Sequence, residues 1–331
     1  MGEWLFDADT LASGRFVLSP LAETLGSLRD LEAQQADHPG RRAWMDAVLP
    51  AHRAHMRANP VAHRILLEGL VPSRTRWNAD FLTPPPRGAF EPDFEDELAV
   101  VRATPPAQAR ADLAVSVGGP LPEILCRDDL PTIAADALAE VWRYAVEPFW
   151  TRRRRVLEAD IIARTRQLSR DGWAAALEGL SPGIRWLGDG RLRINAAEHP
   201  PRDVSGVRLF LVPITSSRGW VSWSDGATPD GVRYAKYYPC AGELATPDPV
   251  LAPQALARLL GEGRAAVLTL LSDPKSTTQL VALTGLPLGS VGRHLKILLD
   301  ARLADRRRSG RSVLYYRTRT GDALITAQLT P

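Results

Sequence analysis

The chain has 331 residues, with 41 Lys and Arg against 38 Asp and Glu, a net charge of +3, and 45% hydrophobic residues. This composition is typical of a globular protein with one to three domains. Only two cysteines occur, which excludes a disulfide framework, and no stretch reaches the roughly 18 apolar residues of a membrane helix. No signal-peptide pattern is visible, and we expect a cytoplasmic protein with no membrane partner.

The first part of the chain, residues 1–180, has the pattern of a mostly helical region. Ser19 is expected to cap a helix over 19–34, because Pro20 follows at the first helical position and leucines then recur every three or four residues. Two further helices are predicted over 40–58 and 60–70. Five prolines between residues 72 and 92 predict an exposed, mobile loop.

A longer helical pattern covers residues 131–170. Apolar residues recur along one of its faces, at Leu138, Val141, Trp142, Ala145 and Phe149. Pro148 is expected to kink or break this helix, because proline lacks an N–H group and its ring collides with the preceding turn. Asp171–Gly172 is expected to end it.

Residues 184–240 change to a pattern of β-strands. Gly188-Asp189-Gly190 is the turn of a predicted hairpin, and apolar or alternating runs follow at 207–214, 220–223 and 232–239. We expect these strands to form a small sheet. Three prolines within 244–253 then indicate a linker.

These patterns predict an α+β protein with two domains. A mostly helical body with a small sheet is expected over residues 1–245, as a sensing or dimerisation domain of unknown function, and a C-terminal domain over 246–331. Residues 251–331 carry twelve Lys and Arg against five Asp and Glu, a net charge of +7, which leaves −4 for the first 250 residues. A basic module on a mildly acidic body indicates that the C-terminal domain binds a polyanion.

The C-terminal elements follow the order of a winged helix–turn–helix domain. Helices are predicted over 254–271, 276–284 and 288–301, and strands over 303–308 and 312–317. The stretch TTQLVALTGLPLGSVGRHLKILLDARLADRRRSGRSVLYYRT resembles the winged-helix domain of the arsenic-repressor (ArsR/SmtB) family of bacterial regulators. The matching residues are Leu280, Leu283, Gly285, Leu286, Val291, His294, Leu295, Leu298, Leu303, Arg307, Arg308, Gly310, Arg311, Tyr315 and Tyr316.

The second helix of the pair contains GSVGRHLKIL (289–298) and is predicted to read DNA. An apolar stripe faces inward, at Val291, Leu295, Leu298 and Leu299. Ser290, Arg293 and Lys296 therefore face outward, where Arg293 is expected to contact a base, preferably guanine, and the other two to hold phosphates. The wing is expected to lie along the DNA backbone or to enter the minor groove through Arg306, Arg307, Arg308 and Arg311.

Two glycines weaken the start of this helix. Gly289 and Gly292 each cost roughly 1 kcal/mol relative to alanine, and Pro287 offers no side-chain cap. Both glycines permit a close approach of the backbone to phosphates, but they remove side chains that read bases. Specificity is therefore expected to depend on Arg293, Ser290 and the arginines of the wing.

Several of these features have a second interpretation. The wing arginines could form only a solvated charge cluster that protects a strand edge from aggregation. The run Arg152–Arg155 is expected to be a solvated helix face or to form ion pairs within the protein. His294 is expected to be a packed or hydrogen-bonded side chain rather than a ligand.

The family resemblance also implies two places for a metal site, and both lack the ligands. The first helix of the pair has no cysteine in 279–283, and the C-terminal segment 322–329 has Asp322 but no histidine. We therefore expect neither a metal nor a cofactor. His52, His55 and His63 are interpreted as part of a polar helix face that also contains Arg53, Arg57 and Arg64, with metal binding as the alternative. Cys126 and Cys240 are interpreted as ordinary small apolar residues.

The first 240 residues contain no glycine-rich phosphate loop, HExxH or GxSxG motif, so we do not expect an enzyme. The stretches RFVLSPLAETLGSLRDL, LFLVPITSSRGWVSW and VRYAKYYPC are similar to an uncharacterised domain that precedes ArsR-type winged helices in high-GC bacteria. This resemblance implies a sensing, dimerising or partner-binding body. Its nine tryptophans either pack in the core or line an apolar effector pocket.

Together, these features predict a sequence-specific DNA-binding transcription regulator, a repressor that acts as a homodimer on a palindromic operator in double-stranded DNA. The dimer contacts are expected on helix 254–271, through Leu256, Leu259, Leu260, Val267 and Leu270. A small molecule or a protein is the expected effector at the N-terminal body. The alternatives are an enzyme or a protein-interaction body with an appended winged helix.

Overall fold

A computed structural model describes residues 2–34, 39–71, 75, 77–88, 90–178, 180–181, 183–194, 201–224, 231–240, 254–272, 274–309 and 312–326. The chain folds into two compact units. The first comprises Met1–Ala36, Trp44–Trp150 and Arg164–Pro239, and the second comprises Asp37–Ala43, Thr151–Ala163 and Cys240–Pro331. Within the described ranges, no helix has both the length and the apolar character needed to cross a membrane.

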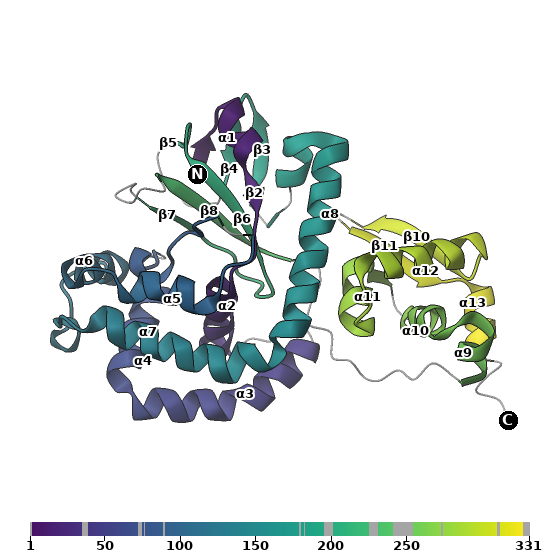
Figure 1. Cartoon of the computed structure of the whole chain (residues 1–331), viewed down its shortest axis with the longest axis horizontal. Coiled ribbons are helices and arrows are strands. Elements are labelled where there is room, and N and C mark those ends of the chain that lie inside the picture. The colour runs from purple at the N-terminus through teal and green to yellow at the C-terminus, as the bar shows by residue number, and fades with distance from the viewer. Residues whose placement is uncertain are drawn as a thin grey trace. The chain divides into compact units, whose positions relative to one another are not determined.

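The first unit is mainly helical (Figure 1). The predicted helix over 19–34 is confirmed, and the Ser19 hydroxyl oxygen accepts a hydrogen bond from the Ala22 N–H at 3.0 Å. The helices predicted over 40–58 and 60–70 are also present. The elements up to residue 125 are α1 Ala8–Ser13, α2 Pro20–Ala33, α3 Pro39–Ala58, α4 Pro60–Leu70, α5 Phe94–Arg102, α6 Pro106–Val117 and the short 3₁₀ turns η1 Asp80–Leu82 and η2 Glu123–Leu125.

The proline-rich segment after α4 is not an exposed loop, so that prediction is wrong for its described part. Phe81, Leu82 and Thr83 are buried. The Pro84 carbonyl accepts a hydrogen bond from the Tyr237 hydroxyl at 3.2 Å. Proline has no backbone N–H, so a buried proline-rich segment contains fewer backbone N–H groups that need a hydrogen-bond acceptor.

Pro148 breaks the long helical pattern, as predicted. The α-helix α7 (Leu130–Val141) passes into a π-helical turn η3 (Trp142–Val146) and a 3₁₀ turn η4 (Glu147–Phe149) before α8 (Trp150–Leu177) begins. The predicted end at Gly172 is an interruption instead. Gly172 has φ 78° and ψ 177°, and helical structure continues to Leu177.

The described residues of the first unit form two four-stranded sheets, so the prediction of a small sheet from residues 184–240 was too simple. Their strand orders are β3-β4-β1-β5 and β2-β6-β8-β7. Each sheet takes one strand from the first sixteen residues: β1 pairs with β4 and β5, and β2 pairs in parallel with β6. The bounds are β1 Glu3–Leu5, β2 Arg15–Phe16, β3 Arg185–Gly188, β4 Arg191–Arg193, β5 Arg202–Asp203, β6 Arg208–Ile214, β7 Val221–Ser224 and β8 Arg233–Pro239.

The predicted hairpin around Gly188-Asp189-Gly190 is confirmed, because β3 and β4 pair antiparallel on either side of it. All three turn residues have positive φ, which glycine adopts without strain. Gly190 has a second constraint. A Cβ at this position would lie 2.4 Å from the Phe6 carbonyl oxygen, so the turn can pack closely on the chain that leaves β1.

Aromatic rings of the first unit pack against one another. Trp142 stacks on Phe94 with ring centres 4.6 Å apart, and Trp220 stacks on Tyr237 at 4.4 Å. Both contacts belong to one large apolar core that joins the helices to β6 and β8. These contacts support the interpretation of the tryptophans as core residues.

A buried carboxyl group lies within this unit. Glu97 on α5 accepts a hydrogen bond from the Leu21 N–H, at the start of α2, with 2.8 Å between N and Oε2. Burial raises the pKa of Glu97 to about 8, although the hydrogen bonds from Leu21 and Ser19 oppose that rise. The carboxyl group is therefore mostly protonated in the folded protein at neutral pH, and ionised in the unfolded chain.

This difference predicts that the free energy of unfolding of the first unit falls as the pH rises. A carboxyl whose pKa is raised by folding stabilises the protein below its unfolded pKa, and this contribution is lost as the pH rises through the folded value of about 8. Urea unfolding followed by tryptophan fluorescence checks this, since all nine tryptophans precede residue 224. Glu97→Gln should flatten the pH profile; an unchanged slope would show that other groups cause it.

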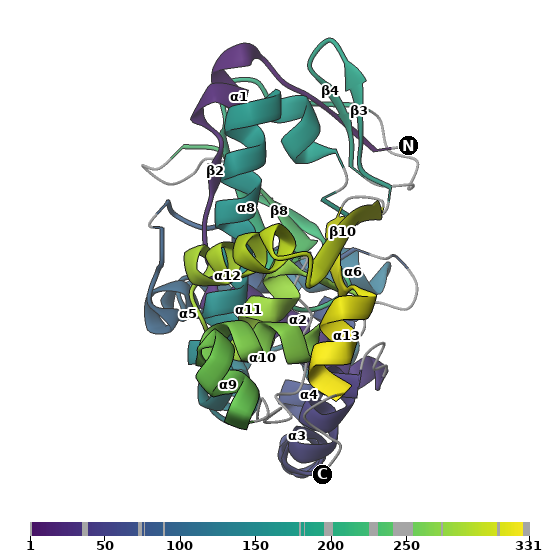
Figure 2. The same cartoon turned by 90° about the vertical axis from the view of Figure 1, so that its right-hand side faces the viewer.

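The second unit contains the C-terminal elements (Figure 2). The single helix predicted over 254–271 is wrong, because Gly261, with φ 85°, separates α9 from α10. The helix pair and both wing strands are present near their predicted bounds, and β9 adds a third strand in the order β10-β11-β9. The bounds are α9 Gln254–Leu260, α10 Glu262–Leu270, β9 Lys275–Ser276, α11 Thr277–Thr284, α12 Leu288–Asp300, β10 Ala304–Ser309, β11 Ser312–Arg317 and α13 Arg319–Thr326.

Most of the leucines and valines expected at a dimer interface lie in the core of this unit instead. Leu256, Val267 and Leu270 are buried in its apolar cluster, and Leu260 is partly buried against it. Only Leu259 among the five is exposed, at 69%. An interface through α9 and α10 would therefore use Leu259 and the polar surface near it, and not the predicted apolar set.

Candidate nucleic-acid interface

The first helix of the pair, α11, is capped at both ends. The Ser276 hydroxyl oxygen accepts a hydrogen bond from the Gln279 N–H at 3.2 Å, and the Gln279 side chain accepts one from the Ser276 N–H at 2.7 Å. At the other end, Gly285 adopts φ 67° and its N–H bonds the Val281 carbonyl at 2.9 Å. These caps fix the tight turn that leads into α12.

The second helix, α12, is attached to the domain by an apolar stripe. Val291, Leu295 and Leu298 are buried, and Leu299 is partly buried. Pro287 precedes the helix without a side-chain cap, as predicted. Packing of this stripe, rather than local helix propensity, therefore stabilises α12.

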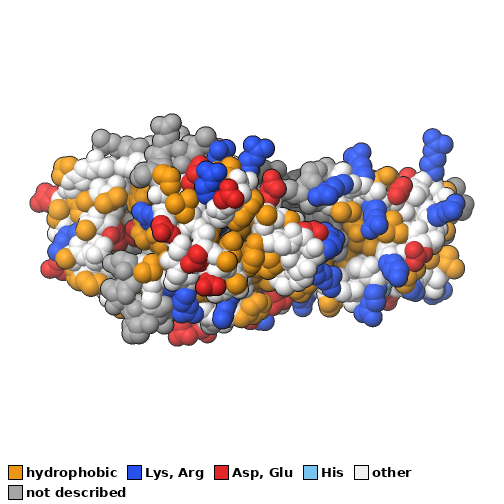
Figure 3. All heavy atoms as spheres, turned by 90° about the horizontal axis from the view of Figure 1, so that it is seen from above, with side chains coloured by type: hydrophobic (Ala, Val, Ile, Leu, Met, Phe, Trp, Pro, Cys, Tyr) orange, Lys and Arg blue, Asp and Glu red, His pale blue; other side chains and the backbone are white. Residues whose placement is uncertain are grey.

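The face of α12 opposite the stripe carries the predicted DNA contacts. Arg293 and Lys296 are exposed, and Ser290 lies at the side of this face, partly buried. The Arg293 guanidinium is 3.5 Å from the Ser290 hydroxyl, at the outer limit of a hydrogen bond. Neither long side chain has an acidic partner in the described part of the chain, so both are available to a polyanion. Figure 3 shows Lys and Arg side chains spread over the surface of this unit.

Gly289 and Gly292 are exposed on the same helix. A Cβ at either position would meet no atom within 4 Å in the described structure. Neither glycine is required by the packing of the unit itself. Any requirement for a bare backbone must therefore come from a bound partner.

Gly292→Ser is expected to keep DNA binding and to stabilise the helix slightly. The serine side chain meets open space, and helix propensity improves by up to about 0.5 kcal/mol. Thermal unfolding and DNA affinity of the two proteins check this. Loss of DNA binding in a protein that still folds would show that the DNA backbone approaches Gly292 too closely for a side chain.

The arginines of the wing are divided between the two faces of the hairpin. Strands β10 and β11 pair antiparallel, with Arg306 opposite Tyr315 and Arg308 opposite Val313. Because side chains alternate along a strand, Arg306 and Arg308 share one face and Arg307 lies on the other. All three are exposed. The fourth predicted residue, Arg311, lies outside the described residues.

Arg307 has its own surroundings. Its guanidinium carbon lies 6.0 Å from the centre of the Tyr316 ring. Both residues line a pocket of about 340 Å³, together with Arg317 and Asp322. Arg317 and Asp322 form an ion pair at 2.9 Å. Arg306 and Arg308 therefore lie on the face of the hairpin away from this pocket. Arg307 lies on the opposite face and lines the pocket.

His294 is a packed side chain, as predicted. A Cβ at Gly263 would lie 2.5 Å from its Nε2, so the ring covers the first turn of α10. Burial and the neighbouring Arg264 and Arg293 lower the pKa of His294. A neutral imidazole ring can pack on α10 without charge repulsion from Arg264 and Arg293.

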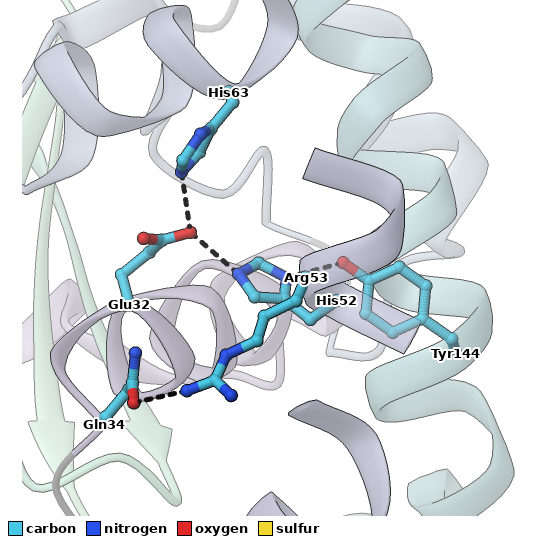
Figure 4. Close-up of polar contacts among 6 residues, drawn as sticks. All are labelled: Glu32, Gln34, His52, Arg53, His63 and Tyr144. Carbon is cyan, nitrogen blue, oxygen red and sulfur yellow. Dashed lines mark hydrogen bonds and ion pairs between the residues drawn. The ribbon is translucent and has the colours of Figure 1, made fainter. Parts of the chain in front are cut away.

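A second polar cluster occurs in the first unit, and the sequence did not indicate it as a group. One oxygen of Glu32 (α2), Oε1, lies 2.7 Å from Nε2 of His52 (α3) and 3.3 Å from Nε2 of His63 (α4) (Figure 4). The other ring nitrogen of His52 is 2.8 Å from the hydroxyl of Tyr144 in η3. A single carboxylate thus connects three helices and the π-helical turn.

The structure bears on the interpretations of the three histidines, the arginine run and the two cysteines. The polar helix face of His52, His55 and His63 is wrong, since His52 is buried and hydrogen-bonded. Within the run Arg152–Arg155, Arg154 pairs with Glu158 as expected, but Arg153 is buried. Of the two free cysteines, Cys126 is exposed and Cys240 is partly buried.

Within the part of the chain that the structure describes, no three His, Cys, Asp or Glu side chains are arranged to hold a metal ion.

Comparison with known proteins bears on the second unit. Residues 261–306 match the family model described as bacterial regulatory protein, arsR family. The matched segment includes α10, α11, α12 and the first arginine of the wing, Arg306. Searches of curated proteins and of solved structures find no match. Residues 261–306 therefore form an ArsR-family helix–turn–helix domain, and this domain supports a role of the chain in DNA-binding transcription regulation.

Proposed function

We propose that the chain is a repressor that binds a palindromic operator as a homodimer in the cytoplasm, and that its first unit receives an effector. The observation that carries the proposal is the face of α12. Arg293 and Lys296 are exposed there, opposite the apolar stripe of Val291, Leu295 and Leu298, within a segment that matches an arsR-family model. An exposed basic helix face of this kind fits the major groove.

The dimer is inferred from the size of the reading surface. One helix contacts only a few base pairs, and two helices related by a two-fold axis read a palindrome with much higher specificity. Binding of purified protein to fragmented genomic DNA, followed by sequencing of the bound fragments, tests the proposal and yields the operator. Absence of enriched fragments would overturn it.

Lys296→Ala should reduce the salt dependence of binding to that operator. One lost phosphate contact lowers the slope of log affinity against log salt by about 0.9, so a dimer should lose about 1.8. Fluorescence anisotropy over a salt series measures this slope. Arg166→Ala, an exposed arginine on α8 in the first unit, is the control. A loss near 0.9 would favour one reading helix per complex, and an unchanged slope would remove Lys296 from the interface.

A further inference from the structure

The Glu32 cluster borders a pocket in the first unit. The pocket has a volume of about 280 Å³ and is formed by residues of α2, α3 and α4. Its apolar lining comes from Leu31, Leu49 and Met56. Such a volume holds a small organic molecule with one short chain or one ring.

The polar wall of the pocket is held in a fixed arrangement. Burial alone would raise the pKa of Glu32, but the hydrogen bond from His52 and the nearby His63 lower it. The ionised carboxylate must accept, so His52 Nε2–H donates to it and, in the neutral ring, Nδ1 accepts from the Tyr144 hydroxyl. Burial also raises the pKa of Tyr144, which keeps that hydroxyl protonated as a donor.

The contact of His63 with the Glu32 carboxylate is long. His63 Nε2 is buried and, despite its 3.3 Å distance from Glu32 Oε1, makes no hydrogen bond of good geometry in the described structure. Unsatisfied buried nitrogen atoms are costly, and a ligand acceptor at this place would remove the cost.

Two arginines of α3 supply the positive charge of the pocket. Arg53 and Arg57 are exposed, lie four residues apart and both line it. Residues with this spacing are neighbours on a helix. Arg53 bonds the neutral Gln34 side chain at 2.7 Å (Figure 4), and neither arginine has an acidic partner among the described residues. Two arginines against one carboxylate give the pocket an excess positive charge when both histidines are neutral.

We propose that this pocket binds a small carboxylic acid with an apolar body. The carboxylate would bond Arg57 and Arg53, and the apolar body would cover Leu49 and Met56. Guanidinium groups bind carboxylates with paired hydrogen bonds, and the apolar lining excludes a bare inorganic anion as the best ligand. Use of the site as the effector site rests on the proposed function, whereas binding itself does not.

Calorimetry of the full chain with hexanoate and benzoate tests the binding site. We expect a dissociation constant below about 1 mM for at least one acid, and binding at least about tenfold weaker for the matched neutral amide. Arg57→Gln should weaken the acid about tenfold, and Arg42→Gln, an exposed arginine elsewhere on α3, should not. Equal binding of acid and amide, or no binding of either acid, would overturn the proposal.

Two further arms separate the remaining explanations. Binding of inorganic phosphate as tight as that of the acids would overturn the proposed ligand. Binding of Zn²⁺ that is lost in Glu32→Gln would overturn it as well, in favour of a metal site. The acid that binds should change operator affinity at least about fivefold. An unchanged operator affinity would overturn the effector role and leave the site, while absence of DNA binding would contradict the proposed function and leave the calorimetry intact.

Discussion

Arg293→Ala is expected to relax the preference for one base pair in each half of the operator. An arginine that bonds guanine through both its O6 and N7 contributes about 1–3 kcal/mol of discrimination, which corresponds to roughly 5- to 150-fold in relative affinity. Arg293 is exposed on α12, the helix that we propose enters the major groove. Competition binding against operators substituted one base pair at a time measures this preference.

Two further variants distinguish a base contact of Arg293 from a phosphate contact. Lys296→Ala should weaken all operator variants by the same factor, because a phosphate contact does not depend on the base. Arg293→Lys keeps the charge but loses the planar pair of donors, so it should resemble alanine in specificity and the native protein in salt dependence. If Arg293→Ala weakens every sequence equally, Arg293 contacts phosphate and the bases are read elsewhere.

Leu295→Ala is expected to destabilise the second unit by about 2–5 kcal/mol, the usual cost of truncating a buried leucine. Leu295 is 2% exposed and belongs to the core stripe of α12. Ile297 lies two residues later on the same helix and is 44% exposed. Ile297→Ala should change the stability by less than about 0.5 kcal/mol.

The stability of this unit has to be measured separately. All nine tryptophans precede residue 224, so tryptophan fluorescence reports the first unit and should be the same in both variants. Hydrogen exchange of backbone amides in α11 and α12 reports the second unit. Similar exchange in Leu295→Ala and Ile297→Ala would contradict the burial that attaches α12 to its domain.

The winged helix could be predicted from the sequence because its determinants are local. The stripe of α12, the glycine turn after α11 and the alternation of β10 and β11 are all visible within a few residues of one another. The exception is the helix predicted over 254–271. Apolar periodicity continued across Gly261, and only its positive φ in the structure reveals the break.

The first unit was harder to predict because its determinants are distant in sequence. Nothing near Glu3–Leu5 or Arg15–Phe16 indicates a strand, since the partners that make them strands are β4, β5 and β6. The proline-rich sequence around Phe81 predicts an exposed loop, and it does so wrongly for the same reason. Its burial depends on Tyr237 and other residues far along the chain.

The candidate ligand pocket shows the same limitation. The spacing of His52, His55 and His63 predicts a polar helix face. In the structure, His52 on α3 and His63 on α4 both contact Glu32, which lies on α2. The signal that could have found the site is the pairing of Arg53 and Arg57 without acidic residues at neighbouring helix positions.

The long-range strand pairs have a consequence for the order in which the protein forms during synthesis. Trp4 pairs with Leu192 and Arg202, and Phe16 with Leu211. At translation rates of about 5–20 residues per second, the first strands wait roughly ten to forty seconds for their partners. The helices between them contain local hydrogen bonds that can begin to form during that wait. Neither sheet can therefore be complete until residues beyond 200 have been made, and a ribosome-bound chain exposes its two earliest strands to chaperones during that time.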